Sequence, residues 1–363
     1  MPEDRLYDAD IVDTRPVIEL DGEQYETIPE LLVSVEMREQ LGGLSSVEIL
    51  LDNHLDHEGV GLDFAWEFTE TNRFAPGAAL RLLTGDAAAP TELFRGRISA
   101  VALEMAERGQ PRLRVMAEDA LMPWRMIRRD RTFAEGPLRD LLERLTADTG
   151  LTAVITGLND EVDAQQQLNE TDLGFLRRLL ERYDADAQVV AEELHISPRA
   201  AVDRGGVTLE LGRQLRSIRV TADLADQRAE TRISGFDLIG GSAEAITASE
   251  DQLGPGEGVT GSELVEDAFP GTADRLTRMA FRNTAEGQAL ADMAQRRRAR
   301  RFVIAEGEAT GNPAIRVGTV LTLEGLGPRF SNDYYTVSAC HRYHRRQGYR
   351  TDFTAECAYL GRI

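Results

Sequence analysis

The stretch "QQQLNETDLGFLRRLLERYDADAQVV", residues 165–190, lies between two parts of the chain that have the alternation typical of β-strands. From Leu173 onward its apolar residues recur at helical spacing, which predicts an amphipathic helix. Asn169 and Thr171 are the candidate N-caps of this helix. We predict that one face of it is a buried core, formed by Leu173, Phe175, Leu176, Leu179 and Leu180.

A second helix is predicted upstream, in the stretch "EGPLRDLLERLTADTGL". Pro137 suits its first turn and Gly150 its end. One stripe of this helix is apolar: Leu138, Leu141, Leu142 and Leu145. Two helices that are apolar on one side only must pack on each other or on a sheet. We therefore assign residues 131–204 to a small helical α/β insert.

The chain before the insert has the pattern of an antiparallel β-domain, residues 1–130. Asp21-Gly22 stands between alternating flanks, which is a strong hairpin signal. A second hairpin is predicted over residues 94–117, with its turn near Gly109. Residues 1–130 are therefore predicted to form a first antiparallel β-domain.

Strand alternation returns after the insert, in residues 205–363. Residues 240–271 are rich in Gly, Ser, Glu and Asp and predict a mobile loop or connection. A helix is predicted over residues 283–301, where Asn283 and Glu286 have the spacing of a capping box. Four strands then end the chain, so this part is predicted to be a second β-domain.

The two β parts resemble each other. Each has a glycine before a strand with the same leucine phase, then an aromatic-led strand, then a turn and a closing strand. We align residues 77–82 with 318–323, 94–101 with 335–343, and "PRLRVMAED" at 111–119 with "YRTDFTAEC" at 349–357. If three chains with two such domains close about a three-fold axis, the ring presents six similar domains.

The charge of the chain restricts its partners. The formal net charge is −21, which disfavours a nucleic-acid or anionic-membrane surface as the main partner. All 41 basic residues are arginine, so Schiff-base chemistry on a lysine is excluded. The N-terminus is acidic and lacks a signal peptide, and no stretch approaches a membrane span. We expect assembly in the cytoplasm.

A run of arginines ends the predicted helix at 283–301. In so acidic a chain these side chains will pair with carboxylates first, and at a helix C-terminus they also complement the dipole. We interpret the run as a candidate subunit interface or a helix-end feature, and not as a nucleic-acid patch: Arg296, Arg297, Arg298, Arg300 and Arg301.

No catalytic, cofactor or metal motif is recognised. The cluster "LDNHLDHEG" holds Asp52, His54, Asp56 and His57, but it lacks the spacing of a structural zinc site and we interpret it as a solvated loop. His341 is predicted to be a hydrogen-bonded barrel residue. We predict no cofactor, no metal and no enzymatic activity.

Several of these residues resemble a known family. The segment from Asn169 to Leu179, Asn-Glu-Thr-Asp-x-x-Phe-Leu-x-x-Leu, is similar to the phage late control protein D and VgrG-like hub proteins. The C-terminal order is similar as well: the predicted helix, then Gly311-x-Pro313 with Gly318, then Tyr335-x-Val337 and His341. Together the resembling segments cover nearly the whole chain.

The resemblance implies two tube-like β-barrel domains flanking the helical insert, in a trimeric hub of a contractile injection system. Such a homotrimer would receive a hexameric inner tube protein on one face and a trimeric spike protein on the other, among other baseplate proteins. Exposed strand edges and loop tips would meet the tube, while the barrel sides and the helix at 283–301 would close the trimer. The insert would fix the angle between the barrels.

The chain ends at Ile363, without the fused spike of VgrG. We therefore expect a separate spike chain, and a phage tail, tailocin or extracellular particle instead of a type VI spike. Two other functions stay open. A tail-tip cell-wall hydrolase would need a catalytic constellation that is not apparent, and a type VI-like effector carrier would guide cargo through an acidic lumen.

Overall fold

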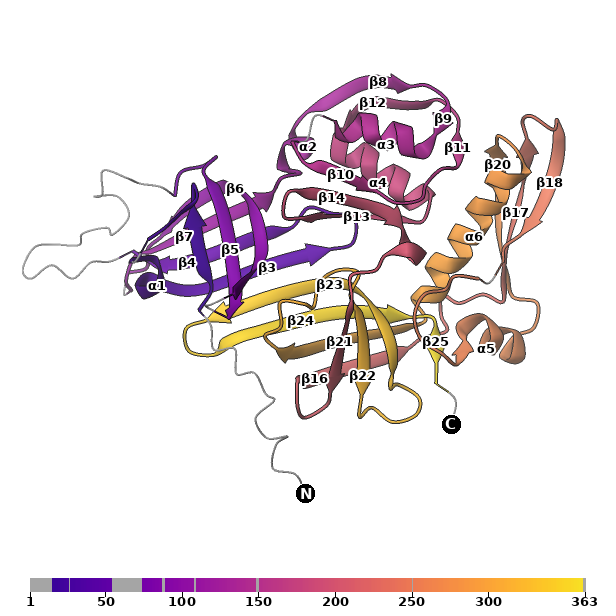
Figure 1. Cartoon of the computed structure of the whole chain (residues 1–363). Coiled ribbons are helices and arrows are strands. Elements are labelled where there is room, and N and C mark those ends of the chain that lie inside the picture. Colours follow the sequence, from indigo (N-terminus) through magenta and orange to yellow (C-terminus); the bar gives the residue numbers. More distant parts are fainter. Residues whose placement is uncertain are drawn as a thin grey trace, which may run out of the picture.

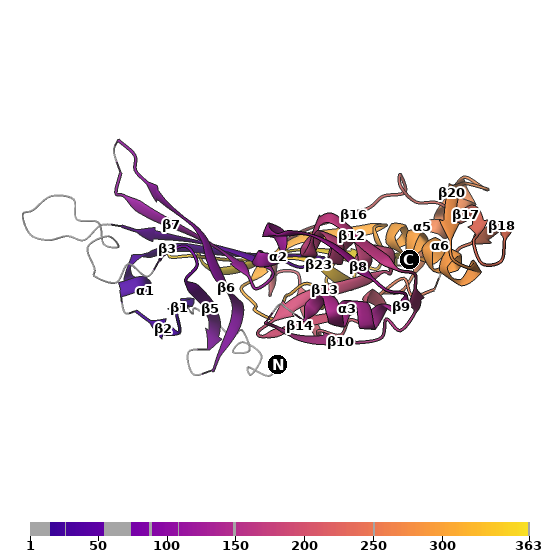
Figure 2. The ribbon, with the colours of Figure 1, turned by 90° about the horizontal axis from the view of Figure 1, so that it is seen from above.

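The computed structural model of the chain describes residues 15–361 except 26, 54–73, 87–88, 108, 148–149 and 250. The fold is mainly β. It comprises two strand units of the same design, an α/β insert between them in the sequence, and a smaller sheet covered by a long helix (Figure 1). Figure 2 shows the first strand unit and the helix-covered sheet at opposite ends of an elongated molecule.

The first strand unit has the sheet order β3-β4-β7-β6-β5-β1. The predicted Asp21-Gly22 hairpin is confirmed: Leu20 pairs with Glu23, and both turn residues have positive φ, 51° and 86°. The elements of this unit are β1 (Val17–Leu20), β2 (Glu23–Gln24), α1 (Thr27–Leu31), β3 (Leu32–Gln40), β4 (Ser46–Asp52), β5 (Ala79–Asp86), β6 (Ala89–Glu104) and β7 (Arg112–Asp119).

The second strand unit has the order β16-β21-β24-β23-β22-β15, which is the same order strand for strand. One pairing differs, because β15 is parallel to β22 whereas β1 is antiparallel to β5. The elements are β15 (Gly206–Glu210), β16 (Leu215–Ala222), β21 (Val303–Thr310), β22 (Val320–Glu324), β23 (Asn332–His344) and β24 (Gly348–Cys357).

The strands of each unit alternate because one face is buried. In β3, Val35 and Met37 point into the core, and Glu36 and Arg38 point away from it. The apolar core of the first unit draws on β1, β3, β4, β5, β6 and β7, and that of the second on its six equivalent strands. Each unit therefore folds over a core formed mainly by its own strands, and Tyr343 of β23 adds to the core of the first unit.

The repeat extends to local irregularities. Gly77 donates to Ile98 O and Gly318 donates to Thr336 O, both at positive φ. The bulge between Ile98 and Ala100 in β6 recurs between Thr336 and Ser338 in β23. In these registers residues 111–119 are structurally equivalent to residues 349–357, as the sequence alignment predicted.

The predicted match of residues 94–101 with 335–343 is wrong by several residues. Leu82 pairs with Phe94 in the first unit, and the equivalent Leu323 pairs with Asn332 in the second. Phe94 therefore corresponds to Asn332, and not to Tyr335. The aromatic residue that leads each strand sits at a different register, because the two cores are filled from different positions.

The two units are joined in one 13-stranded sheet, a connection that the sequence analysis did not predict. Residues 338–344 of β23 pair antiparallel with residues 34–40 of β3 (Figure 1). Among the described strands, none of the pairings closes either unit on itself. The second half of β23 is free to join the other unit because β22 covers only its first half, at residues 332–335.

The insert packs α3, α4 and the short helix α2 with short strands around one apolar core. The quoted stretch at 165–190 is a strand, a helix and a strand, and Thr171, not Asn169, is the N-cap that accepts from Gly174 N. The elements are α2 (Met122–Met126), β8 (Arg128–Phe133), β9 (Gly136–Pro137), α3 (Leu138–Thr146), β10 (Thr152–Ile155), β11 (Glu161–Val162), β12 (Gln165–Thr171), α4 (Asp172–Arg182), β13 (Ala185–Val190), β14 (Glu193–Pro198) and the 3-10 turn η2 (Arg199–Ala201).

A further unit stands between β16 and β21, where the first strand unit has only a short turn. Its sheet β18-β17-β20 is covered by α6, which Asn283 caps. Much of the predicted loop at 240–271 is ordered, with a capping box of Thr260 and Glu263 opening α5. The elements are β17 (Glu230–Asp237), β18 (Ser242–Thr247), β19 (Val259–Thr260), α5 (Gly261–Ala268), β20 (Ala273–Phe281) and α6 (Thr284–Arg300), with β19 pairing to β25 (Tyr359–Leu360).

Among the described helices, none combines the length and apolar character needed to cross a lipid bilayer.

Candidate functional site

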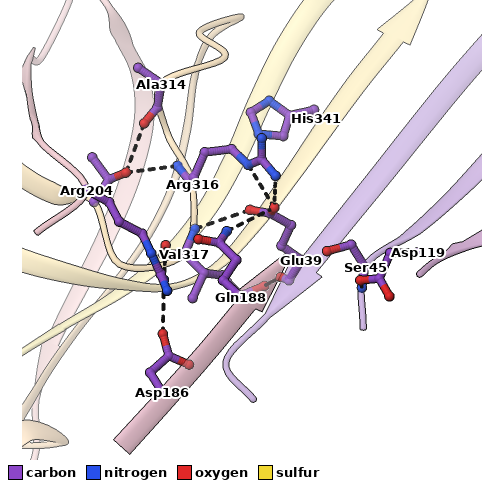
Figure 3. Close-up of polar contacts among 12 residues, drawn as sticks. Glu39, Ser45, Asp119, Asp186, Gln188, Arg204, Ala314, Arg316, Val317 and His341 are labelled. Atoms are coloured by element: carbon purple, nitrogen blue, oxygen red, sulfur yellow. Dashed lines mark hydrogen bonds and ion pairs between the residues drawn. The ribbon is translucent and has the colours of Figure 1, made fainter. Parts of the chain in front are cut away.

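The two strand units and the insert meet at one buried carboxylate, that of Glu39 in β3. Its side chain is 2% exposed. Arg316 Nε donates to Glu39 Oε1 at 2.8 Å and Val317 N donates to Oε2 at 3.3 Å, both from the second unit (Figure 3). Gln188 Nε2, from β13 of the insert, donates to Oε1 at 3.2 Å. One side chain thus ties three parts of the molecule together. We call Glu39, Gln188, Arg316 and His341 the junction cluster.

The charges of the junction cluster are balanced. Burial alone would raise the pKa of Glu39, but the adjacent Arg316 guanidinium outweighs it, so the pKa lies below its ordinary value. Burial and the same guanidinium lower the pKa of His341 to about 4. His341 is therefore neutral near pH 7. Its Nδ1 lies 2.7 Å from the Tyr349 hydroxyl, as expected for a hydrogen-bonded residue of the sheet.

Two further buried carboxylates hold the connections around the cluster. Asp186 of the insert accepts from Arg204 Nη1 at 3.0 Å, and the same nitrogen donates to Val317 O at 2.8 Å. Asp119, at the end of β7, accepts from Ser45 N at 2.5 Å and from Leu121 N at 2.9 Å. Burial is the main cause that raises the pKa of Asp119 to about 6. These bonds fix where the chain enters and leaves the insert.

Arginines of the insert also bind both strand units. Arg177 of α4 donates to Gly42 O at 3.1 Å and to Gly43 O at 3.0 Å, in the turn between β3 and β4. Arg199 forms an ion pair with Glu356 of β24, and both side chains are largely buried. The predicted role of the insert in fixing the angle between the two units is consistent with these contacts.

The side chains predicted to form the core of the insert are all buried in it: Leu173, Phe175, Leu176, Leu179 and Leu180. Phe175 stacks on Phe133 with ring centroids 5.3 Å apart. The Arg178 guanidinium also lies over the Phe175 ring, at 4.9 Å from its centroid.

The arginines at the end of α6 pair with carboxylates of their own chain. Arg300 is 5% exposed and holds Asp184 of the insert through two bonds, at 2.6 and 2.8 Å. Arg301 is exposed. The remaining pairs are Arg296 with Asp251, Arg297 with Glu181 and Arg298 with Asp274. Four of the five charges are therefore neutralised without a second copy of the chain.

The candidate metal cluster falls mostly outside the described residues, which include Asp52 but not His54, Asp56 or His57. Within the described ranges, no group of three or more His, Cys, Asp or Glu side chains could hold a metal ion. His341 is buried and His344 is half-buried, and the two side chains, three residues apart on β23, point to opposite faces of the sheet.

The sequence analysis missed the junction cluster apart from His341. A signal was present: Glu39 continues the inward alternation of Val35 and Met37, so a carboxylate stands at a core position. A charge in such a place needs a cation, and this chain can supply only arginine or histidine. The cation is Arg316, which lies in a connection far along the chain from Glu39. No local pattern in the sequence links the two residues.

His341 and Asp119 should give the stability opposite dependences on pH. As pH falls from 6.5 to 4, His341 takes up a proton in the unfolded chain before it does in the folded one, so its contribution to stability is lost. We expect the unfolding free energy of the wild type, relative to His341→Gln, to fall by up to about 3 kcal/mol over this range. Chemical denaturation at each pH measures it.

Asp119→Asn is the matched comparison. Because the pKa of Asp119 is raised from 3.8 to about 6, its contribution is present at low pH and is lost as pH rises through 6. The wild type should therefore gain stability relative to Asp119→Asn as pH falls from 6 to 4. Parallel slopes for the two variants would contradict both assignments.

Solved structures of several tail proteins have a similar fold. The 43 kDa tail protein of prophage MuSo2 from Shewanella oneidensis has a TM-score of 0.68 and 16% identity, over 94% of this chain and 98% of that one. The tail protein from Neisseria meningitidis MC58 has a TM-score of 0.65 and 11% identity, over 94% and 96%. At such identities the likeness shows the fold alone.

A third similar structure is the E. coli c3393 protein, a component of the type VI secretion system, with a TM-score of 0.57 and 14% identity over 95% of this chain and 79% of that one. No curated protein sequence matches the chain. The family model described as "Alg8 N-terminal domain" matches residues 13–344, which span the first strand unit, the insert and the second strand unit as far as the end of β23. The chain therefore belongs to the Alg8 N-terminal domain family.

Proposed function

We propose that this chain is the structural hub of a contractile injection system, a homotrimer that adapts a six-fold inner tube to a three-fold spike. One observation carries the proposal: a single chain holds two units with the same strand order and the same bulges, in one continuous sheet. Three copies would present six similar units in a ring, as needed where a hexameric partner meets a trimeric one.

The structural comparisons support a tail or baseplate role. The E. coli c3393 protein is described as similar to the T4 bacteriophage tail proteins gp27 and gp5. The Francisella PdpA-VgrG complex is also similar, with a TM-score of 0.54 and 9% identity over 96% of this chain and 58% of that one. These proteins belong to the same kind of assembly as the late control protein D and VgrG-like hubs that the sequence resembles.

The proposed partners are a hexameric inner tube protein, a trimeric spike protein and other baseplate proteins. The net charge of −21 argues against nucleic acid and anionic membrane as partners. The hub would act by interface complementarity and not as an enzyme. It would assemble in the cytoplasm and then become part of a tail or particle baseplate.

The trimer is tested by mass. The chain has a mass of 40.2 kDa, and native mass spectrometry of the purified protein should show a species of three times that value. Its population should rise with protein concentration, and averaged electron micrographs should show rings with six similar lobes. A dimer or tetramer as the end state, or a monomer at every concentration with and without the spike protein, would overturn the proposal.

A further inference from the structure

We propose that neighbouring copies of this chain join by antiparallel strand pairing, with residues 101–104 of β6 in one copy lying beside residues 219–222 of β16 in the next. The inference rests on the proposed ring and names the two edges that close it. In the expected register Val101 faces Ala222, Ala102 faces Thr221, Leu103 faces Val220 and Glu104 faces Arg219.

At these residues neither edge is paired by another described strand of the same chain. The edge of β6 that faces away from β7 is paired as far as Ile98, which bonds to Gly77 and Ala78. Beyond it, none of the described strands pairs with this edge. The edge of β16 that faces away from β21 is likewise unpaired from Ser217 onward by any described strand. Free edges present unused N–H and C=O groups to which a further strand can add.

The chain already contains this contact once. β23 is the equivalent of β6, and β3 is the equivalent of β16; both pairs of strands share their bulge positions. β23 and β3 join the two units through the register Cys340–Arg38 and Arg342–Glu36. Transferring that register to β6 and β16 gives the pairs proposed above. The contact between chains would therefore repeat the contact that joins the two units within a chain.

The apolar side chains at the two edges match. On the core-facing side, Val101 and Leu103 of β6 would meet Val220 and Ala222 of β16. Leu103 is 46% exposed in the single chain, a large apolar side chain without a cover. Val220 packs only partly on the core of the second unit. Strand pairing would cover both side chains and continue the two cores across the boundary between copies.

The charges on the other side match with reversed signs. Within the chain, Glu36 lies opposite Arg342, which pairs with Asp352 at 2.6 Å. Between copies, Arg219 would lie opposite Glu104, which pairs with Arg114 at 2.6 Å. In the contact within the chain, Glu36, Arg342 and Asp352 are negative, positive and negative. In the contact between copies, Arg219, Glu104 and Arg114 are positive, negative and positive.

This reversal selects the order of units in the ring. Pairing β6 of one copy with β3 of another would place Glu104 opposite Glu36, and pairing β23 with β16 would place Arg342 opposite Arg219. Like charges directly opposite each other across two strands are destabilising. The edges therefore favour an alternating ring, in which a first unit always meets a second unit.

Cysteine pairs test the register in the full chain. Ala102→Cys with Thr221→Cys places two thiols on directly opposed positions of the same face, within reach of a disulfide. Ala102→Cys with Arg219→Cys is the matched control, because its thiols share the face but stand two residues out of register. Cys340 and Cys357 are free in all variants, so the wild type reports any background.

Under mild oxidation, the opposed pair should give covalent dimers and trimers at several times the level of the control, and the wild type should give none. A trimer by native mass without preferential cross-linking of the opposed pair would overturn the edge assignment and leave the hub proposal standing. Absence of any trimer, in variants that keep the wild-type thermal midpoint, would overturn both.

Exchanging the two opposed charges tests the same register independently and needs no new cysteine. Arg219→Glu places two carboxylates opposite each other at each contact and should weaken trimer formation about tenfold. Adding Glu104→Arg should restore most of the loss. Unchanged assembly of the Arg219→Glu variant, or a double variant no better than the single one, would contradict the proposal.

Discussion

Arg316→Met should lower the free energy of unfolding by about 3–5 kcal/mol near pH 7, because it leaves the Glu39 carboxylate buried without its cation. Gln188 and the Val317 amide can still donate to Glu39, but neither carries a charge. The loss should shrink as pH is lowered, since Glu39 can then take up a proton and become neutral. Denaturant titration at neutral and acidic pH measures both effects.

Two controls separate this effect from a general loss of arginine. Arg213→Met removes the partner of Glu210 in an exposed pair, with side chains 58% and 41% exposed, and should cost less than about 0.5 kcal/mol. Glu39→Gln combined with Arg316→Met should be more stable than Arg316→Met alone, because no buried charge is left. If Arg316→Met behaves like Arg213→Met, the junction cluster does not hold the units together.

The consequence of the junction cluster reaches beyond stability. Glu39 lies in β3, the strand that joins the second unit through β23. Loss of Arg316 would loosen that joint and the angle between the units. A ring of six similar units needs a similar angle at every joint, so we also expect Arg316→Met to assemble less well.

Local signals in the sequence predicted much of the strand order. Alternation and turn glycines located the strands, and the alignment of residues 111–119 with 349–357 agrees with the observed registers. Such features depend on neighbours within a few residues, which a sequence displays directly. Amphipathic spacing likewise placed α4, and the hydroxyl of Thr171 marks its start.

The features that were missed depend on distant residues. The pairing of β3 with β23 joins residues about 300 positions apart, and no local pattern indicates it. It joins the two predicted β-domains in one sheet. The segment at 240–271 was predicted to be a loop because it is rich in Gly, Ser, Glu and Asp, although Thr260 and Glu263 have capping-box spacing. The prediction followed the composition of the segment and not the capping-box spacing of Thr260 and Glu263.

Phe175→Ala should cost about 3–5 kcal/mol, the range for removing a fully buried aromatic ring. The ring fills the core of the insert, stacked on Phe133 and covered by Arg178. The damage should be concentrated in the insert, where hydrogen exchange of amides in α3 and α4 should accelerate more than that of amides in β4 and β7. Leu168→Ala, in the neighbouring β12 and 66% exposed, is the control and should cost less than about 0.5 kcal/mol.

The same variant distinguishes a core from a binding face. If the apolar stripe of α4 bound a partner, Phe175→Ala would weaken that binding while leaving the chain as stable as Leu168→Ala does. If the stripe is core, the insert loosens, and with it Gln188, Asp186 and Arg177, which hold the junction and the turn between β3 and β4. Assembly should then fail only under conditions where the insert exchanges faster. Loss of assembly with wild-type hydrogen exchange would show that the stripe acts as a binding face.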